Sequence, residues 1–292
     1  MTDDLETRAP LGGDDARLLA TGLERPEGIT TGPDGGLLAG GMGGQVYRVP
    51  TDGSVAEMYA TIGGICLGLA TDATGRVYVC NPRRGAIVRV APDGTEDVWC
   101  DRLDDGGPLT SPNDCAFGPD GSLWFSMSTD GGPEDRRNPT GRLVRVAPEG
   151  GAGEVQDLPP LAFPNGVCVG GDGTLYVLET HLRRLSAYSG GRLVTVAHTP
   201  GVTPDGVAQT VDGGFVIGAY YPFHLLTIAP GAAESELLYD DPWGATMKMP
   251  ANVAFYGPGL RELAASSLGG RNIYGITPPV AGAPLHYPEV GS

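Results

Sequence analysis

The sequence predicts an all-β protein, a six-bladed β-propeller with four antiparallel strands in each blade. A turn-and-strand pattern recurs six times, with starts at residues 25, 65, 111, 163, 203 and 250, so the intervals are 40 to 52 residues. Short runs of Val, Ile, Leu, Tyr and Phe alternate with polar or small residues, as strands do, and helical periodicity is nearly absent. Repeats of this length with four short strands each are typical of propeller blades.

Each repeat opens with two strands joined by a glycine-containing turn. The turns read PDG, ATG, GDG or VDGG, and such residues adopt the backbone conformations that tight hairpins need. The 48 glycines thus recur as turn residues between apolar runs, and not in low-complexity tracts. The six openings are residues 25–40, 65–80, 111–126, 163–178, 203–218 and 250–265.

A third strand follows each opening, and a fourth follows in all repeats but the last. The expected third strands are 45–50, 86–92, 142–150, 184–189, 225–230 and 272–277, and the fourth strands are 56–60, 96–100, 154–158, 193–197 and 235–239.

The last repeat needs an outer strand from elsewhere. Residues 16–23, ARLLATGL, can supply it and close the ring, which removes exposed sheet edges. The LHY segment at 285–287 is the alternative. We therefore expect a tail at 1–15 and a single propeller domain at 16–292 that an N-terminal strand closes.

The net charge of −16 disfavours a nucleic-acid or anionic-membrane partner, because both require a basic surface. The N-terminus lacks the apolar region of a secretory signal, and no apolar run is long enough to span a membrane. The five cysteines include no CxxC pair, so reduced and mostly buried thiols are expected. A cytoplasmic protein with a small-molecule substrate fits these features, and the oligomeric state is left open.

One position just before the first strand of each repeat is usually polar. In a propeller the first strands line the central channel, so this column should converge on the axis. Two carboxylates among amides would repel each other unless a cation joined them, although a single Asn could serve only a local turn. Oxygen ligands suit a hard divalent cation, Ca²⁺ before Mg²⁺ or Mn²⁺, and the lack of His and Cys disfavours structural zinc. The column reads Glu27, Leu67, Asn113, Asn165, Asp205 and Asn252.

The motifs RPEG, SPND, FPNG and TPDG, in this order at blade spacing, resemble the gluconolactonase, senescence-marker and luciferin-regenerating superfamily over residues 23–279. The resemblance implies that Glu27, Asn165 and Asp205 hold a divalent metal, with Ca²⁺ expected and Mg²⁺, Mn²⁺ or Zn²⁺ as alternatives. It also implies that Asn113 completes the metal shell or contacts substrate, and that Asp205 is the general base or the nucleophile.

The chain departs from the family at several positions. Ser126, Met127 and Ser128 stand where many bacterial lactonases have Thr-Asp-Pro, and Glu179 stands where Asp is common. We interpret these changes as lying around the pocket and affecting the choice of substrate more than the cation.

Loops after the second strands should surround the cation, because antiparallel strands return to the face where the first strands begin. These loops offer cationic and aromatic side chains that could contact an oxygenated small molecule. The candidate substrate-binding residues are His181, Glu179, Arg83, Tyr220, Tyr221 and Trp243.

The leading functional hypothesis is a Ca²⁺-dependent hydrolase of a lactone or related ester. A second hypothesis keeps the cation but assigns a phosphotriesterase or a biosynthetic enzyme that opens, isomerises or closes a ring. A third is a non-enzymatic binding propeller. No GxSxG, HExxH or P-loop motif points to other chemistry.

Overall fold

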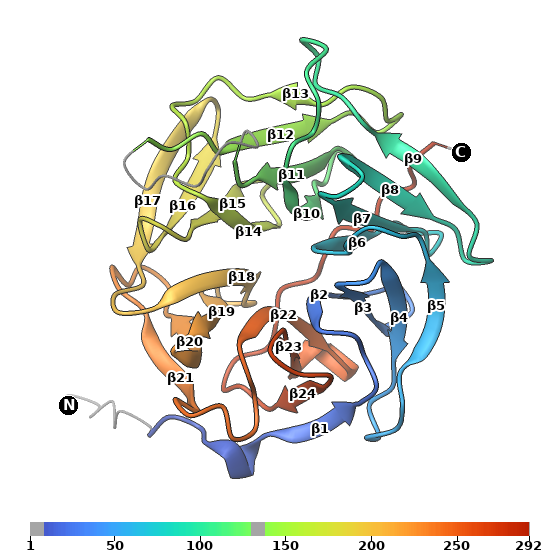
Figure 1. Cartoon of the computed structure of the whole chain (residues 1–292). Helices are drawn as coiled ribbons and strands as arrows, with labels where there is room; N and C mark the ends of the chain where they lie inside the picture. The colour runs from blue at the N-terminus through green and yellow to red at the C-terminus, as the bar shows by residue number, and fades with distance from the viewer. Residues whose placement is uncertain (1–8, 130–137, 292) are drawn as a thin grey trace.

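The protein forms six four-stranded antiparallel sheets arranged around a central axis, which confirms the predicted six-bladed propeller (Figure 1). The computed structural model describes residues 9–129 and 138–291. Five sheets follow the chain in order from the axis outward, so the first strand of each blade is innermost. This order places the six first strands around the channel, as the sequence pattern predicts.

The blades are bounded as follows. Blade one holds β2 (Pro26–Thr31), β3 (Leu37–Gly41), β4 (Gln45–Val49) and β5 (Glu57–Thr61), and blade two holds β6 (Leu69–Thr71), β7 (Val77–Asn81), β8 (Ala86–Val90) and β9 (Glu96–Cys100). Blade three holds β10 (Pro112–Phe117), β11 (Leu123–Met127), β12 (Arg142–Val146) and β13 (Glu154–Val155), and blade four holds β14 (Pro164–Val169), β15 (Leu175–Glu179), β16 (Arg184–Ser189) and β17 (Arg192–His198). Blade five holds β18 (Thr203–Gln209), β19 (Phe215–Tyr221), β20 (Phe223–Ile228) and β21 (Glu236–Asp240).

The sixth blade joins the two ends of the chain. It contains β22 (Pro250–Tyr256), β23 (Glu262–Ser267) and β24 (Ile273–Ile276), and β1 (Arg17–Ala20) pairs antiparallel with β24 as the outermost strand. The ring is thus closed by hydrogen bonds between an N-terminal strand and a C-terminal strand. Two short 3₁₀ turns, η1 (Gly13–Asp15) and η2 (Pro258–Leu260), flank these elements.

The core is divided among the interfaces between neighbouring blades. Six clusters of buried apolar side chains each draw on two adjacent blades. Between blades two and three, the ring of Tyr78 meets Trp99 and Phe117 edge-on, with centroids 5.3 and 4.9 Å away. Packing of this kind fixes each blade against the next and so fixes the first strands around the axis. The five cysteines are free and buried.

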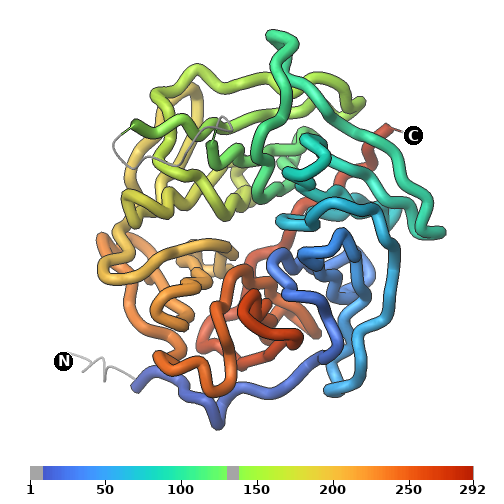
Figure 2. Tube along the Cα trace, viewed as in Figure 1, coloured from blue at the N-terminus to red at the C-terminus, as the bar shows by residue number. Residues whose placement is uncertain are grey.

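The C-terminal segment runs from the middle of the ring to its edge (Figure 2), and residues 283–287 line a cavity together with later residues of the first strands. Val211 N donates to Ala281 O (2.9 Å), Tyr287 Oη donates to Thr31 O (2.9 Å), and Ala73 N donates to Pro288 O (3.0 Å). These bonds tie the segment to blades five, one and two. The LHY residues therefore cover the channel, and they form no strand.

No helix within residues 9–129 and 138–291 has the length and apolar character required to span a bilayer.

Candidate metal centre

The first strands share an irregular start that places one residue of each blade in an equivalent position. In β2 the pairing with β3 slips between Pro26 and Ile29, and β10, β14, β18 and β22 show the same slip after Pro112, Pro164, Pro204 and Pro250. The residue directly after each of these prolines therefore occupies an equivalent place. These residues are Glu27, Asn113, Asn165, Asp205 and Ala251.

This register corrects the sequence alignment in blade six. Pro250 pairs with Ser267 and Val253 with Ala265, so Ala251 is the equivalent of Glu27. Asn252 lies one position further along its strand than the column to which it was assigned. The column thus carries four oxygen-bearing side chains in the described structure, together with Leu67 and Ala251.

The next position in each strand is glycine in four blades, because the neighbouring blade leaves no room for a side chain. A Cβ at Gly28 would lie 2.0 Å from Leu67 O, and one at Gly206 would lie 2.3 Å from Asn252 Oδ1. Only blades three and six carry side chains here, Asp114 and Asn252. Close approach of the strands therefore brings the column residues together around the axis.

Asp114 is a buried carboxylate that the sequence analysis did not single out. Its Oδ2 accepts a hydrogen bond of 3.0 Å from Val167 N in the next blade. Burial raises its pKa to about 6, while the N–H groups of Val167 and Cys115 and the Asn252 side chain act in the opposite direction. The signal in the sequence is the D of SPND, which stands where blades one, two, four and five have Gly.

The carboxylates at the axis are buried and repel one another, which raises their pKa values. Burial raises the pKa of Glu27 to about 8, the charge of Asp114 adds to this rise, and the charge of Arg25 opposes it. Burial likewise raises the pKa of Asp205 well above its ordinary value, and repulsion from Glu27 and then Asp114 adds to it. Carboxylates gathered in this way are stabilised in their charged form by a bound cation.

The two asparagines of the column are held differently. Asn113 Nδ2 donates to Ser128 Oγ (2.8 Å), and Asn165 Nδ2 donates to Thr180 Oγ1 (3.3 Å). Asn165 Oδ1 is buried and receives no hydrogen bond from the residues that the structure describes. A buried carbonyl oxygen without a donor is costly, and coordination of a cation would satisfy it.

Hydroxyl groups fix the backbone of the column across the blade interfaces. Ser126 Oγ donates to Asn165 O (2.6 Å) in the next blade, Thr180 Oγ1 donates to Pro204 O (2.9 Å), and Ser266 Oγ donates to Glu27 O. Ser128 Oγ also donates to Pro164 O (3.1 Å). Both hydroxyls therefore support the column. Ser128 also lines a small pocket with Phe163 and His181, so the effect of these positions on the substrate stays a prediction.

Glu179 is also a support and not a pocket residue. It is 1% exposed, and its carboxylate accepts hydrogen bonds from Ala162 N (3.0 Å) and Arg184 Nε (2.5 Å). Ser186 Oγ donates to the same group at 3.4 Å. The carboxylate is thus occupied beneath the loop that carries Phe163, which contradicts its assignment to substrate binding.

The remaining candidate substrate residues lie on the face of the column but differ in their surroundings. His181 is half-buried and stacks on Phe163, with ring centroids 5.1 Å apart. Arg83 is exposed in the turn after β7, and Tyr220 is half-buried. Tyr221 is 67% exposed and Trp243 is 89% exposed, so Trp243 faces solvent. His181 and Tyr220 are therefore the better placed of these residues.

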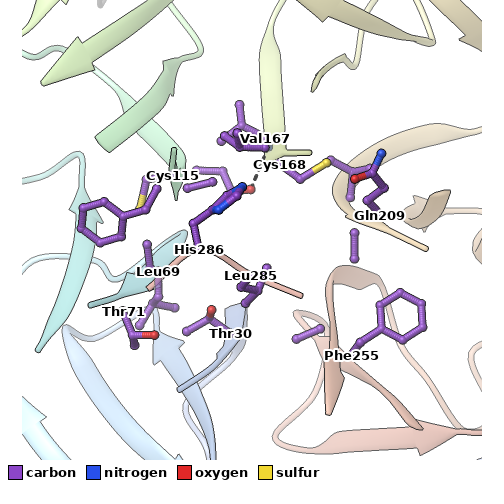
Figure 3. A pocket seen from close by; sticks show the side chains of 18 of the residues that line it. Thr30, Leu69, Thr71, Cys115, Val167, Cys168, Gln209, Phe255, Leu285 and His286 are labelled. Atoms are coloured by element: carbon purple, nitrogen blue, oxygen red, sulfur yellow. Dashed lines mark hydrogen bonds between the residues drawn. The ribbon is translucent and has the colours of Figure 1, made fainter. Parts of the chain in front are cut away.

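A cavity of about 80 Å³ occupies the other half of the channel (Figure 3). Its lining includes Asp114 and Asn252 as well as the C-terminal residues 283–287. His286 Nε2 lies 3.0 Å from Gly170 O and holds the segment in place. The channel is thus closed on the far side, and the column is approached from the face on which the first strands begin.

The donor set at the axis fits a hard divalent cation. Two carboxylates and two amide oxygens occupy equivalent places on four strands, and one amide oxygen lacks a donor. In the described part of the chain, no three His, Cys, Asp or Glu side chains are grouped to hold a metal. A cation here would therefore depend on the asparagines as well as on Glu27 and Asp205.

Residues 97–269, more than half of the chain, match the family described as SMP-30/Gluconolactonase/LRE-like region. No curated protein sequence matches the chain.

Several solved structures share the fold at low identity. A gluconolactonase from Xanthomonas campestris is 22% identical with a TM-score of 0.74, and the match covers 90% of this chain and 89% of that one. Regucalcin from Agrobacterium tumefaciens, a calcium-binding protein, is 15% identical with a TM-score of 0.77, covering 98% and 100%. A luciferin-regenerating enzyme is 17% identical with a TM-score of 0.71, covering 92% and 97%. At these identities the structures show the common fold.

Proposed function

The chain belongs to the SMP-30/gluconolactonase/LRE-like family, and from that premise we propose that it is a divalent-metal-dependent hydrolase of a lactone or related ester. Ca²⁺ is the cation that we propose. The observation that carries the proposal is the set of Glu27, Asn113, Asn165 and Asp205 at equivalent places around the axis. The pKa values of the two carboxyl groups are raised, and Asn165 Oδ1 receives no hydrogen bond from the described residues. The gluconolactonase and the calcium-binding regucalcin among the solved structures with this fold support the same choice.

A bound divalent cation would polarise the lactone carbonyl and stabilise the negative charge that develops on its oxygen. Glu27, Asn165 and Asp205 would hold the cation, and Asn113 would complete the set or orient the substrate. The bond from Asn113 Nδ2 to Ser128 Oγ fixes the plane of the amide, so its oxygen and its second N–H keep defined directions.

Asp205 is the residue that we propose for the chemical step. It either takes a proton from the attacking water or attacks the carbonyl carbon itself. Burial and the neighbouring carboxylates raise its proton affinity, which favours a base, whereas coordination to a cation lowers it, which favours a nucleophile. In both cases the neighbouring blades hold its strand so that the carboxylate stays at the axis.

Chelation tests the proposed function. Dialysis against EGTA should reduce the hydrolysis of glucono-δ-lactone, followed by acid release, by at least about 100-fold, and added Ca²⁺ should restore it. Acyclic esters and phosphotriesters in the same assay separate a lactonase from the alternative chemistries. Undiminished hydrolysis by the metal-free protein, or no lactone hydrolysis with any divalent cation, would contradict the proposal.

A further inference from the structure

We propose, on the basis of the proposed function, that Arg25 and Lys248 bind an acidic substituent of the lactone substrate, a carboxylate or a phosphate, at the mouth of the channel. The inference names the substrate class of the same site.

Arg25 lies directly beside the candidate metal centre. It precedes Pro26 with φ 47°, a left-handed conformation that a residue before proline rarely adopts, and it stands two residues from Glu27. The side chain is exposed, and its Nε donates weakly to Leu268 O at 3.4 Å. Phe163 and Met249, before Pro164 and Pro250, share this conformation with φ 57° and 53°, so it belongs to the repeated start of the first strands.

Lys248 lies on the same face of the propeller as Arg25, two residues before the start of β22. Gly269 N donates to Lys248 O and Leu268 N donates to Met249 O, both at 3.1 Å, so the Lys248–Met249 backbone pairs with the turn whose Leu268 O contacts Arg25. The side chain is exposed and is the only lysine in the sequence. The two cations thus come from adjacent blades, six and one, and share one connecting turn.

Neither cation forms a close ion pair with the residues that the structure describes, although the charge of Arg25 acts on Glu27. Within residues 9–129 and 138–291, no acidic side chain lies within 4.0 Å of Arg25 or Lys248, whereas neighbouring Glu24 pairs with Arg271 at 3.5 Å. The carboxylate of Asp241, in the loop before Lys248, accepts hydrogen bonds from Ala245, Thr246 and Met247 N–H groups instead. The chain has a net charge of −16, so two positive side chains without a close ion pair beside the site favour an anionic ligand.

If Arg25 and Lys248 only balanced the negative charges of Glu27 and Asp205, they would have no such role once a divalent cation is bound, because the cation itself balances both carboxylates. Arg25 and Lys248 would then be available to a carboxylate or phosphate of the substrate. A guanidinium suits both groups through paired N–H donors, and an ammonium acts as a point charge.

The test compares neutral and acidic lactones. The kcat/KM values of glucono-δ-lactone, its 6-phosphate and a carboxylate-bearing γ-lactone are measured for the wild type, the Arg25→Gln/Lys248→Met double variant and Arg261→Gln. Arg261 is an exposed arginine in the turn after β22, on the opposite face, and serves as the matched control. We expect at least one acidic lactone to be preferred over the neutral one, and the double variant to lose at least about 10-fold of that preference. Comparison of the two acidic lactones tells which anion is bound.

A binding measurement keeps the inference separate from the proposed function. Calorimetry of 6-phosphogluconate, of the open-chain form of the carboxylate-bearing lactone and of gluconate requires no turnover. Gluconate carries only the carboxylate formed by ring opening, and we expect a compound with the additional anionic group to bind more tightly than gluconate only when Arg25 and Lys248 are present. Hydrolysis of the neutral lactone without any acidic preference would overturn the inference and leave the proposed function standing. Equal losses for neutral and acidic compounds in the double variant would also overturn it, because they would assign Arg25 to balancing Glu27. If no lactone is hydrolysed, the proposed function fails, and the calorimetric preference alone decides the inference.

Discussion

Replacement of Asp205 by Asn is expected to lower kcat for lactone hydrolysis by about 1000-fold or more while the fold is kept. The substitution preserves the shape of the side chain and one oxygen, so the packing of β18 is unchanged. It removes the negative charge and the proton acceptor, and groups of this kind contribute roughly 100- to 10,000-fold to rate. Assays at saturating Ca²⁺ separate the loss of chemistry from the loss of metal, and circular dichroism checks the fold.

Asp212→Asn is the matched control for this variant. Asp212 lies in the turn that joins β18 to β19, at the other end of the same hairpin, where its Oδ1 accepts hydrogen bonds from Thr210 Oγ1 (2.6 Å) and Gly214 N (3.1 Å). Its replacement should leave kcat within about 2-fold of the wild type, since it is remote from the column. If Asp205→Asn retained near-normal turnover, the catalytic role of Asp205 would be refuted.

Replacement of Glu27 by Gln is expected to weaken Ca²⁺ binding by about 100-fold, or ~2.7 kcal/mol, because the affinity of oxygen sites for Ca²⁺ follows the number of anionic ligands. The amide keeps the oxygen and the size of the side chain. Calorimetric titration of the metal-free protein measures the change directly. The rise in melting temperature that Ca²⁺ causes should shrink in parallel, since a ligand that binds the native state stabilises it.

Glu24→Gln provides the comparison on the same segment. Glu24 is exposed and pairs with Arg271 at the surface, so its loss should change Ca²⁺ affinity little. An unchanged dissociation constant for Glu27→Gln would remove Glu27 from the ligand set. A similar loss in both variants would indicate that the net charge of the rim, and not direct coordination, determines affinity.

The fold could be predicted from the sequence because each blade repeats its own local signals. Alternating apolar residues and Gly turns specify the hairpins, and their sixfold recurrence at blade spacing specifies the ring. The column could be predicted in blades one, three, four and five because a proline precedes Glu27, Asn113, Asn165 and Asp205. In blade six the sequence pattern places the Asn of PAN in the column instead of Ala251, because the sequence does not show where the strand pairing slips.

The supporting residues of the site could not be predicted, because their partners lie in other blades. Ser126 and Ser128 read as changes beside a pocket, and only the structure shows that their hydroxyls also bond to carbonyl groups of blade four. Glu179 reads as a pocket carboxylate, but the loop at Ala162 and the side chain of Arg184 occupy it. Asp114 could not be singled out from the sequence, because only the three-dimensional arrangement shows that it and Asn252 are the exceptions in a row of glycines.

A cation held at the axis by ligands from separate blades is the central claim, and anomalous diffraction from a crystal soaked in Mn²⁺ tests it most directly. The predicted result is one strong anomalous peak at the channel mouth, about 2.0–2.6 Å from oxygens of Glu27, Asn165 and Asp205, which Ca²⁺ displaces. Diffraction with no peak at the axis, or with a peak bound by other residues, would contradict the account.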